Sequence, residues 1–127
     1  MDKFAHFVSH PASLMAVRRF VATTAQAWGV DVFPIVLLSD ELATNVVDHA
    51  RTDFDVHLSL QPDCVRVEVS DDSPTMPSQR NPGLDADRGR GLLLIDQLAE
   101  TWGAERRGGG KAVWFTVAGA GDSRSGP

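Results

Sequence analysis

The feature of this 127-residue chain that most restricts its fold is a pair of alternating segments near its middle. Residues 55–60 and 64–70 alternate apolar and polar side chains, and a short Gln-Pro-Asp connection joins them. Alternation with a period of two is typical of a strand with one buried face, and two such segments around a short connection predict a β-hairpin. The predicted buried face consists of Val56, Leu58, Leu60, Val65, Val67 and Val69.

Two helical patterns precede this hairpin, after a short apolar segment at residues 4–8 that predicts an edge strand. Apolar residues recur every three or four positions over residues 14–28. This spacing predicts an amphipathic helix that begins near Pro11 and ends at Gly29. Residues 33–50 contain no breaker after their first turn and are apolar around most of the helix circumference. They therefore predict a second helix that is largely buried.

The segments after the hairpin predict a long connector, a helix and a second hairpin. Residues 72–90 contain three prolines and two glycines without apolar periodicity. Connectors of this length inside a compact domain are often functional, so residues 74–90 are interpreted as a lid. A third helix is predicted over residues 91–102, and residues 104–117 predict a hairpin around a triple-glycine turn. The small, polar residues 119–127 are expected to form a flexible tail.

This order of elements predicts an α+β fold with two layers. Three helices are expected to cover one face of a mixed, mainly antiparallel sheet. The chain length fits one domain, which is predicted to span residues 1–118.

Composition and charge exclude several classes of protein. Twelve Lys and Arg against seventeen Asp and Glu give a net charge of −5, a poor match for a nucleic-acid binder that must neutralise phosphates. The single cysteine, Cys64, excludes an intramolecular disulfide, and the four histidines lack zinc-site spacing. No apolar run approaches the roughly 20 residues of a membrane span. We therefore expect a cytoplasmic protein that binds neither nucleic acid nor membrane.

One polar stripe crosses the second predicted helix. At about 100° per residue, Glu41, Thr44, Asn45, Asp48 and His49 fall on one side of it. Such a stripe is commonly just the solvated face of a helix. However, a carboxylate and a carboxamide four positions apart point into the same space, where one can accept a proton and the other can offer an oxygen to Mg²⁺. Both interpretations remain open from the residues alone.

Asp71 continues the inward face of the strand that precedes it, whereas Asp72 should point outward. A buried carboxylate needs hydrogen-bond donors, and the amino group of an adenine would supply them. The alternative is that Asp71 only initiates a turn before the Ser-Pro pair. Farther along, Gly89 and Gly91 precede the third predicted helix, where backbone amides can hold phosphate oxygens. Glycines before helices are also common without a ligand.

Taken together, four segments resemble the conserved boxes of the GHKL (Bergerat-fold) ATPases. They are residues 41–50, residues 69–74, residues 89–92 and residues 110–115, and their order and spacing match over nearly the whole chain. The closest branch is that of the small anti-sigma-factor serine/threonine kinases, because the chain lacks the helix pair that carries the phospho-acceptor histidine of sensor kinases.

This resemblance implies a role for each matched position. Glu41 would be the general base, Asn45 would ligate Mg²⁺, and Asp71 would accept a hydrogen bond from the adenine amino group. The match of His49 to a position near the phosphates is looser, and a supporting histidine is the alternative. The remaining implied nucleotide contacts are Ser73, Gly89, Arg90, Gly91 and Leu92.

Two further positions match the family pattern, and two others differ from it. Lys111 and Trp114 match the closing strand of the family, although a solvated lysine and a packed tryptophan are the favoured interpretation there. Ser73 and Thr75 stand where the family often has glycine, so side chains could narrow the adenine end or weaken nucleotide affinity. This departure favours nucleotide binding over efficient turnover.

The resemblance implies an ATP- and Mg²⁺-binding regulator that phosphorylates an antagonist protein and thereby controls partner switching. Its partners would be a sigma factor, an anti-anti-sigma antagonist, or both, and a homodimer is suggested. One alternative is a non-catalytic module whose affinity for a partner protein depends on ATP. Another is a histidine-kinase-like catalytic domain that acts in trans.

Overall fold

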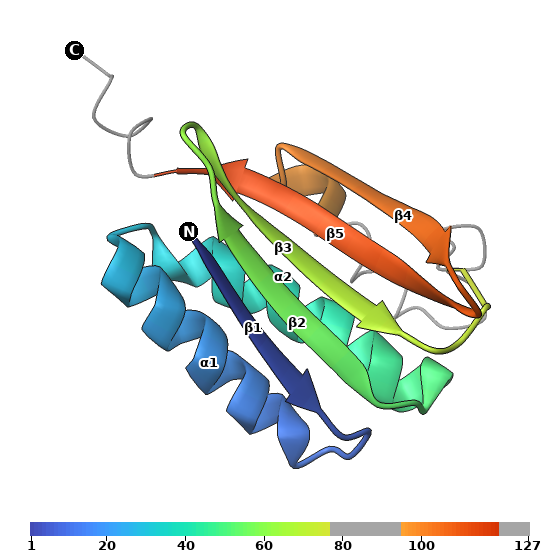
Figure 1. Ribbon diagram of the computed structural model, residues 1–127. Coiled ribbons are helices and arrows are strands. Elements are labelled where there is room, and N and C mark those ends of the chain that lie inside the picture. Colours follow the sequence, from blue (N-terminus) through green and yellow to red (C-terminus); the bar gives the residue numbers. More distant parts are fainter. Residues whose placement is uncertain (77–94, 120–127) are drawn as a thin grey trace.

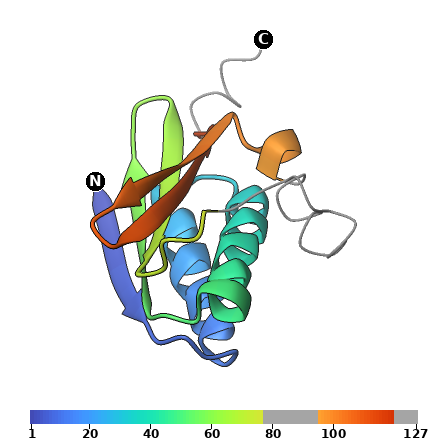
Figure 2. The same cartoon turned by 90° about the vertical axis from the view of Figure 1, so that its right-hand side faces the viewer.

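The computed structural model describes residues 1–76 and 95–119 and has two layers (Figure 1). One layer is a sheet of five strands in the order β1-β2-β3-β5-β4, in which every neighbouring pair is antiparallel. Helices α1 and α2 cover one face of this sheet (Figure 2). The predicted α+β architecture is therefore confirmed. The strands are β1 (Asp2–Phe7), β2 (Phe54–Leu60), β3 (Cys64–Asp71), β4 (Thr101–Arg107) and β5 (Gly110–Ala118).

The predicted hairpin is formed by β2 and β3, and it supplies the centre of the core. Val56 lies opposite Val69, and Leu58 lies opposite Val67. All four side chains are buried against the helices, as the alternation predicts. At full burial, side chains of this size each contribute about 1.5 to 3 kcal/mol, so this face accounts for much of the stability.

The two long helices are α1 (Ser13–Trp28) and α2 (Val32–Asn45). α1 begins two residues after Pro11, because His10 holds the preceding turn: its Nδ1 accepts from the backbone N–H of Ala12 at 3.0 Å. Gly29 ends α1 in the left-handed conformation, with φ of 70°, as predicted. The N-cap of α2 is Asp31, whose carboxylate accepts from the backbone N–H of Phe33.

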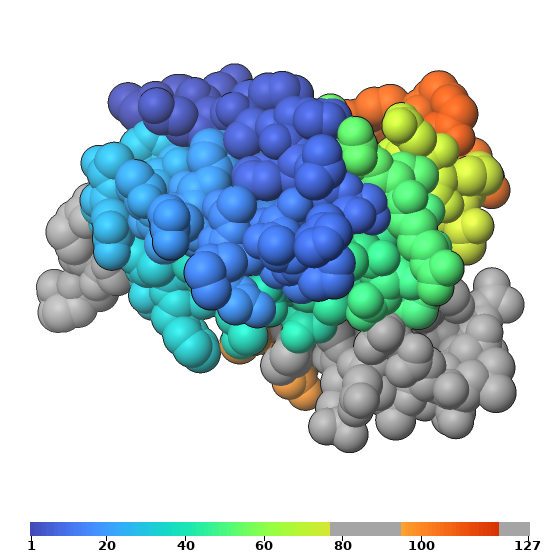
Figure 3. Space-filling model, turned by 90° about the horizontal axis from the view of Figure 1, so that it is seen from below, coloured from blue at the N-terminus to red at the C-terminus, as the bar shows by residue number. Residues whose placement is uncertain are grey.

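α1 is joined to the sheet through β1. Phe7 of β1 packs on Phe20 of α1 and on Phe54 of β2, with ring centroids 6.0 and 5.6 Å apart. Seen from below, α1 and β1 form one continuous surface (Figure 3). No helix within residues 1–76 or 95–119 has the length and hydropathy needed to span a membrane.

The third predicted helix is wrong at its C-terminal end. Within the described part of this predicted helix, only residues 95–98 are helical, and Trp102 lies in β4, opposite Phe115 of β5. The ring of Trp114 lies over Gly103, where a Cβ would meet it at 2.8 Å. Trp102 is half-buried in β4. Its apolar side chain fits the helical period as well as the strand period, and pairing with β5 decides between them.

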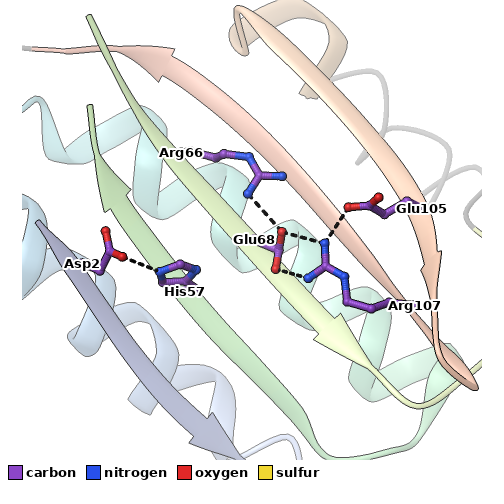
Figure 4. Close-up of polar contacts among 6 residues, drawn as sticks. All are labelled: Asp2, His57, Arg66, Glu68, Glu105 and Arg107. Carbon is purple, nitrogen blue, oxygen red and sulfur yellow. Dashed lines mark hydrogen bonds and ion pairs between the residues drawn. The ribbon is translucent and has the colours of Figure 1, made fainter. Parts of the chain in front are cut away.

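The sheet face opposite the helices carries a cluster of charges around Glu68 (Figure 4). Arg66 and Arg107 both donate to the Glu68 carboxylate, at 3.0 and 2.5 Å, and Arg107 also binds Glu105. Burial raises the pKa of Glu68, but the hydrogen bonds and charges of Arg107 and Arg66 outweigh it, so the pKa lies below its ordinary value. This cluster ties β3 to β4 across the intervening β5.

We expect Glu68→Gln to lower the free energy of unfolding at neutral pH by about 1 to 2 kcal/mol, because two arginines lose a charged partner. A carboxylate with a lowered pKa stabilises the fold above its ordinary value of 4.5, and this stabilisation is lost as the pH falls through the lowered pKa. The gap between variant and wild type in urea unfolding should therefore close on acidification. Glu105→Gln, at an exposed pair, is the control and should cost little. A gap that is constant with pH would contradict this role of Glu68.

Candidate functional site

The polar stripe on α2 is half-buried. Glu41 and Asn45 are both partly covered and lie one turn apart near the C-terminal end of α2. Their position is intermediate between a solvated face and the core. Thr44 and Asp48 are also half-buried, whereas His49 is exposed.

The regular helical spacing ends at Asn45. Val46–Ala50 form a π-helical turn, η1, in which the backbone N–H of Arg51 donates to the carbonyl oxygen of Val46 at 2.7 Å. A π turn holds more residues than an α turn, so the 100° spacing used to place His49 does not apply beyond Asn45. Single π turns occur often at functional sites.

Asp71 ends β3 and is 6% exposed, whereas Asp72 is exposed, so the predicted orientation of both residues is confirmed. The Oδ1 atom of Asp71 accepts the backbone N–H of Ser73 at 2.8 Å. This contact is the Asx turn that the sequence offered as the alternative to a ligand. The turn uses only one of the two carboxylate oxygens.

Lys111 supplies a second donor to the same carboxylate. Its Nζ lies 3.0 Å from Oδ1 of Asp71 as a hydrogen bond and 3.0 Å from Oδ2 as an ion pair. Oδ2 is buried and accepts no hydrogen bond with acceptable geometry. A buried acceptor without a donor is costly, and an amino group of a ligand would remove that cost. Asp71 therefore fits the adenine contact that the resemblance implies.

The interpretation of Lys111 as a solvated lysine was wrong. Lys111 is only 9% exposed, because β3 and β5 pair with Asp71 opposite Lys111. Local sequence patterns do not reveal this pairing, since β4 lies between the two strands in the chain but not in the sheet. The packed interpretation of Trp114 is confirmed, since it is half-buried against Gly103 and lies under the Arg66 guanidinium, 4.8 Å from the ring centroid.

The fold brings α2 and the end of β3 to the same end of the molecule (Figures 1 and 2). The backbone N–H of Asp72 donates to Oγ1 of Thr52 at 3.0 Å, which fastens the end of β3 to the loop that follows η1. Ser73 is half-buried, and its Oγ accepts the backbone N–H of Thr75. The remaining predicted contacts, Gly89, Arg90, Gly91 and Leu92, and most of the predicted lid lie outside the described residues.

A cavity of about 220 Å³ opens beside Asp71. Its lining takes no residue from α2, the helix that carries Glu41 and Asn45. We therefore do not assign a nucleotide to it. The lining residues are His6, Asp53, Asp55, Ser70, Asp71, Asp72, Arg107 and Lys111.

Comparison with known proteins defines the class. Residues 7–117 match the family of the histidine kinase-like ATPase domain, and the chain belongs to this family. It is 38% identical over 84 residues to an uncharacterized protein of Streptomyces coelicolor, SCO4941, an alignment that covers 62% of this chain and 80% of that one. The family match confirms the predicted resemblance.

The fold is also similar to a solved structure, that of the RsbU and RsbW domains of Rv1364c from Mycobacterium tuberculosis. The TM-score is 0.72 at 17% sequence identity, and the match covers 92% of this chain. The chain spans only 32% of the length of that solved chain. This likeness supports the fold that the sequence predicts.

Proposed function

We propose that this protein binds ATP with Mg²⁺ and is a regulatory serine/threonine kinase of the anti-sigma-factor type. The observation that carries the proposal is the buried carboxylate of Asp71, in which Oδ1 accepts two hydrogen bonds and Oδ2 accepts none, although the Lys111 ammonium lies 3.0 Å from Oδ2 as an ion pair. Because the chain belongs to a family of ATPase domains, ATP is the ligand that we propose for this carboxylate. In the proposed complex, Oδ2 accepts a hydrogen bond from the amino group of adenine, which guanine lacks at that position.

The metal would be held jointly by the protein and the nucleotide. Among residues 1–76 and 95–119, no three His, Cys, Asp or Glu side chains form a metal cage. Mg²⁺ usually takes one or two protein ligands and completes its shell with water and phosphate oxygens. Asn45 would supply the amide oxygen, and the metal, when bound, would neutralise charge on the phosphates.

We expect Asn45→Ala to weaken Mg²⁺-dependent ATP binding by at least about tenfold, since even removal of a residue that only supports a metal ligand costs about 10- to 100-fold. The melting temperature should change little, because Asn45 is half-buried and outside the apolar core. Calorimetric titrations with Mg²⁺ and with EDTA measure this effect. Gln26→Ala, which truncates an exposed amide on α1, is the matched control. Equal loss of affinity with and without Mg²⁺ would exclude Asn45 as the metal ligand.

Glu41 is the proposed general base. It lies one turn before Asn45 on the same helix, so its carboxylate and the amide of Asn45 face the same half-buried region. In the proposed reaction, Glu41 takes the proton of a serine or threonine hydroxyl, the hydroxyl oxygen bonds to the γ-phosphorus of ATP, and ADP leaves. Positioning and charge stabilisation carry most of the catalysis in such transfers.

The proposed partners are a sigma factor and an antagonist protein that accepts the phosphate. A pull-down with and without ATP, followed by mass spectrometry of the captured proteins, tests this proposal. We expect a captured protein that acquires phosphate on serine or threonine only when ATP is present. ATP-dependent capture without phosphate transfer would instead identify a binding module, and phosphohistidine on the captured protein would identify a histidine kinase domain acting in trans.

A further inference from the structure

Lys111 is a long cationic side chain that is almost fully buried, which is rare for lysine and requires a paired charge. Its side chain is 10% exposed and that of Asp71 is 1% exposed, so the pair is largely withdrawn from water. Removing two charges from water is expensive, and the mutual attraction of a pair often fails to repay it. The pair therefore calls for an explanation other than stability alone.

The backbone fixes where Lys111 lies. Asp71 and Lys111 are opposite each other in the β3–β5 register. The preceding residue, Gly110, approaches β3 so closely that a Cβ would lie 2.7 Å from Cα of Asp72. No other L-residue fits at Gly110 without moving a strand, and this close approach holds Lys111 against Asp71.

The two carboxylate oxygens of Asp71 are used unequally. Oδ1 receives both the Ser73 N–H, at 2.8 Å, and the Lys111 ammonium, at 3.0 Å. Oδ2 faces the same ammonium as an ion pair but accepts no hydrogen bond. The donors thus fix the rotation of the carboxylate and leave one acceptor position open.

We propose that Lys111 is a positioning residue that acts through Asp71 and presents Oδ2 as the acceptor for the exocyclic amine of adenine. This inference rests on the proposed ATP site and adds the residue that sets its preference for an amino-bearing base. Lysine is suited to this role because its ammonium is a compact charge that can bond one oxygen. Arginine in its place would form a fork that engages both oxygens and leaves none for the base.

The test compares how a change in the protein and a change in the nucleotide, made separately and together, alter the binding affinity. Wild type, Lys111→Met and Lys111→Arg are each titrated calorimetrically with Mg²⁺-ATP and with the triphosphate of purine riboside, which differs from ATP only by lacking the exocyclic amine. Wild type should prefer ATP by roughly 10- to 100-fold, as expected for a hydrogen bond to a charged group. Both variants should reduce this preference to within about threefold, while binding of the purine riboside nucleotide changes little.

Each other outcome overturns the inference. Equal losses for both nucleotides in Lys111→Met would mean that Lys111 only attracts phosphate or supports the fold. Tighter ATP binding in that variant would mean that the lysine occupies the base position. If Lys111→Met does not fold, Lys111→Arg decides alone, because it keeps the buried charge pair. An arginine variant that still prefers ATP over the purine riboside nucleotide as strongly as wild type would contradict positioning by a single donor. A wild-type protein that binds neither nucleotide overturns the proposed function itself, which separates that failure from the others.

Discussion

Replacing Glu41 with glutamine is expected to slow phosphoryl transfer to the antagonist protein by about 10² to 10⁴, the usual contribution of a general base. Glutamine keeps the shape of the side chain but cannot take up the proton of the attacking hydroxyl. ATP affinity should be nearly unchanged, because Glu41 acts on the nucleophile rather than on the nucleotide. Single-turnover phosphorylation at saturating ATP, together with calorimetric ATP binding, separates the two effects.

The matched control is Asp40→Asn, the same chemical change at the neighbouring position of α2. Asp40 faces α1, where Arg18 Nε donates to its Oδ1 at 2.7 Å, so the control probes helix packing and not the half-buried side of Glu41. Its transfer rate should equal that of wild type. If Glu41→Gln transfers phosphate as fast as wild type, Glu41 is not the base. If wild type binds ATP but transfers no phosphate to any partner, the protein is an ATP-dependent binding module.

Replacing Asp71 with asparagine is expected to weaken ATP binding by about 1 to 3 kcal/mol, through loss of a buried, charge-assisted hydrogen bond. Binding of GTP, which offers a carbonyl oxygen at the same position, should not weaken, and the preference between the two bases should shrink. Calorimetric titration of both nucleotides against wild type and variant measures this change.

The adjacent Asp72→Asn is the matched control, because Asp72 is exposed. Asp71→Asn also leaves the buried ammonium of Lys111 without a negative partner, which is destabilising in its own right. Melting temperatures with and without nucleotide therefore accompany the titrations. Equal losses of ATP and GTP affinity would show that the substitution acted through the fold, and Asp71 would not be the base contact.

The fold was predictable where local patterns decide it. The alternation of β2 and β3 and the three- and four-residue spacing of α1 each define one apolar face, and in both cases the structure buries that face. The third predicted helix was wrong beyond residue 98, because Trp102 satisfies a helical stripe and a strand equally well. Its partner, Phe115, lies on β5, and long-range pairing overrides the local pattern.

The sequence predicts which residues belong to the candidate site, but it does not predict how they contact one another. The inward orientation of Asp71 follows from strand alternation, and the structure confirms it. Two features of the site could be found only in the folded structure. The π turn η1 ends at a left-handed residue, Arg51 with φ of 57°, and sequence periodicity reveals neither the turn nor this conformation. The contact between Lys111 and Asp71 joins residues 40 positions apart, through strands that are not consecutive in the chain.

Recognition of adenine by Asp71 is tested by comparing the affinities of wild-type protein for two nucleotides. Wild-type protein is titrated calorimetrically with ATP and with GTP at saturating Mg²⁺. We expect ATP to bind more tightly than GTP by roughly tenfold or more, because Oδ2 of Asp71 accepts from the adenine amino group and repels the guanine carbonyl oxygen. Equal affinities for ATP and GTP would contradict it.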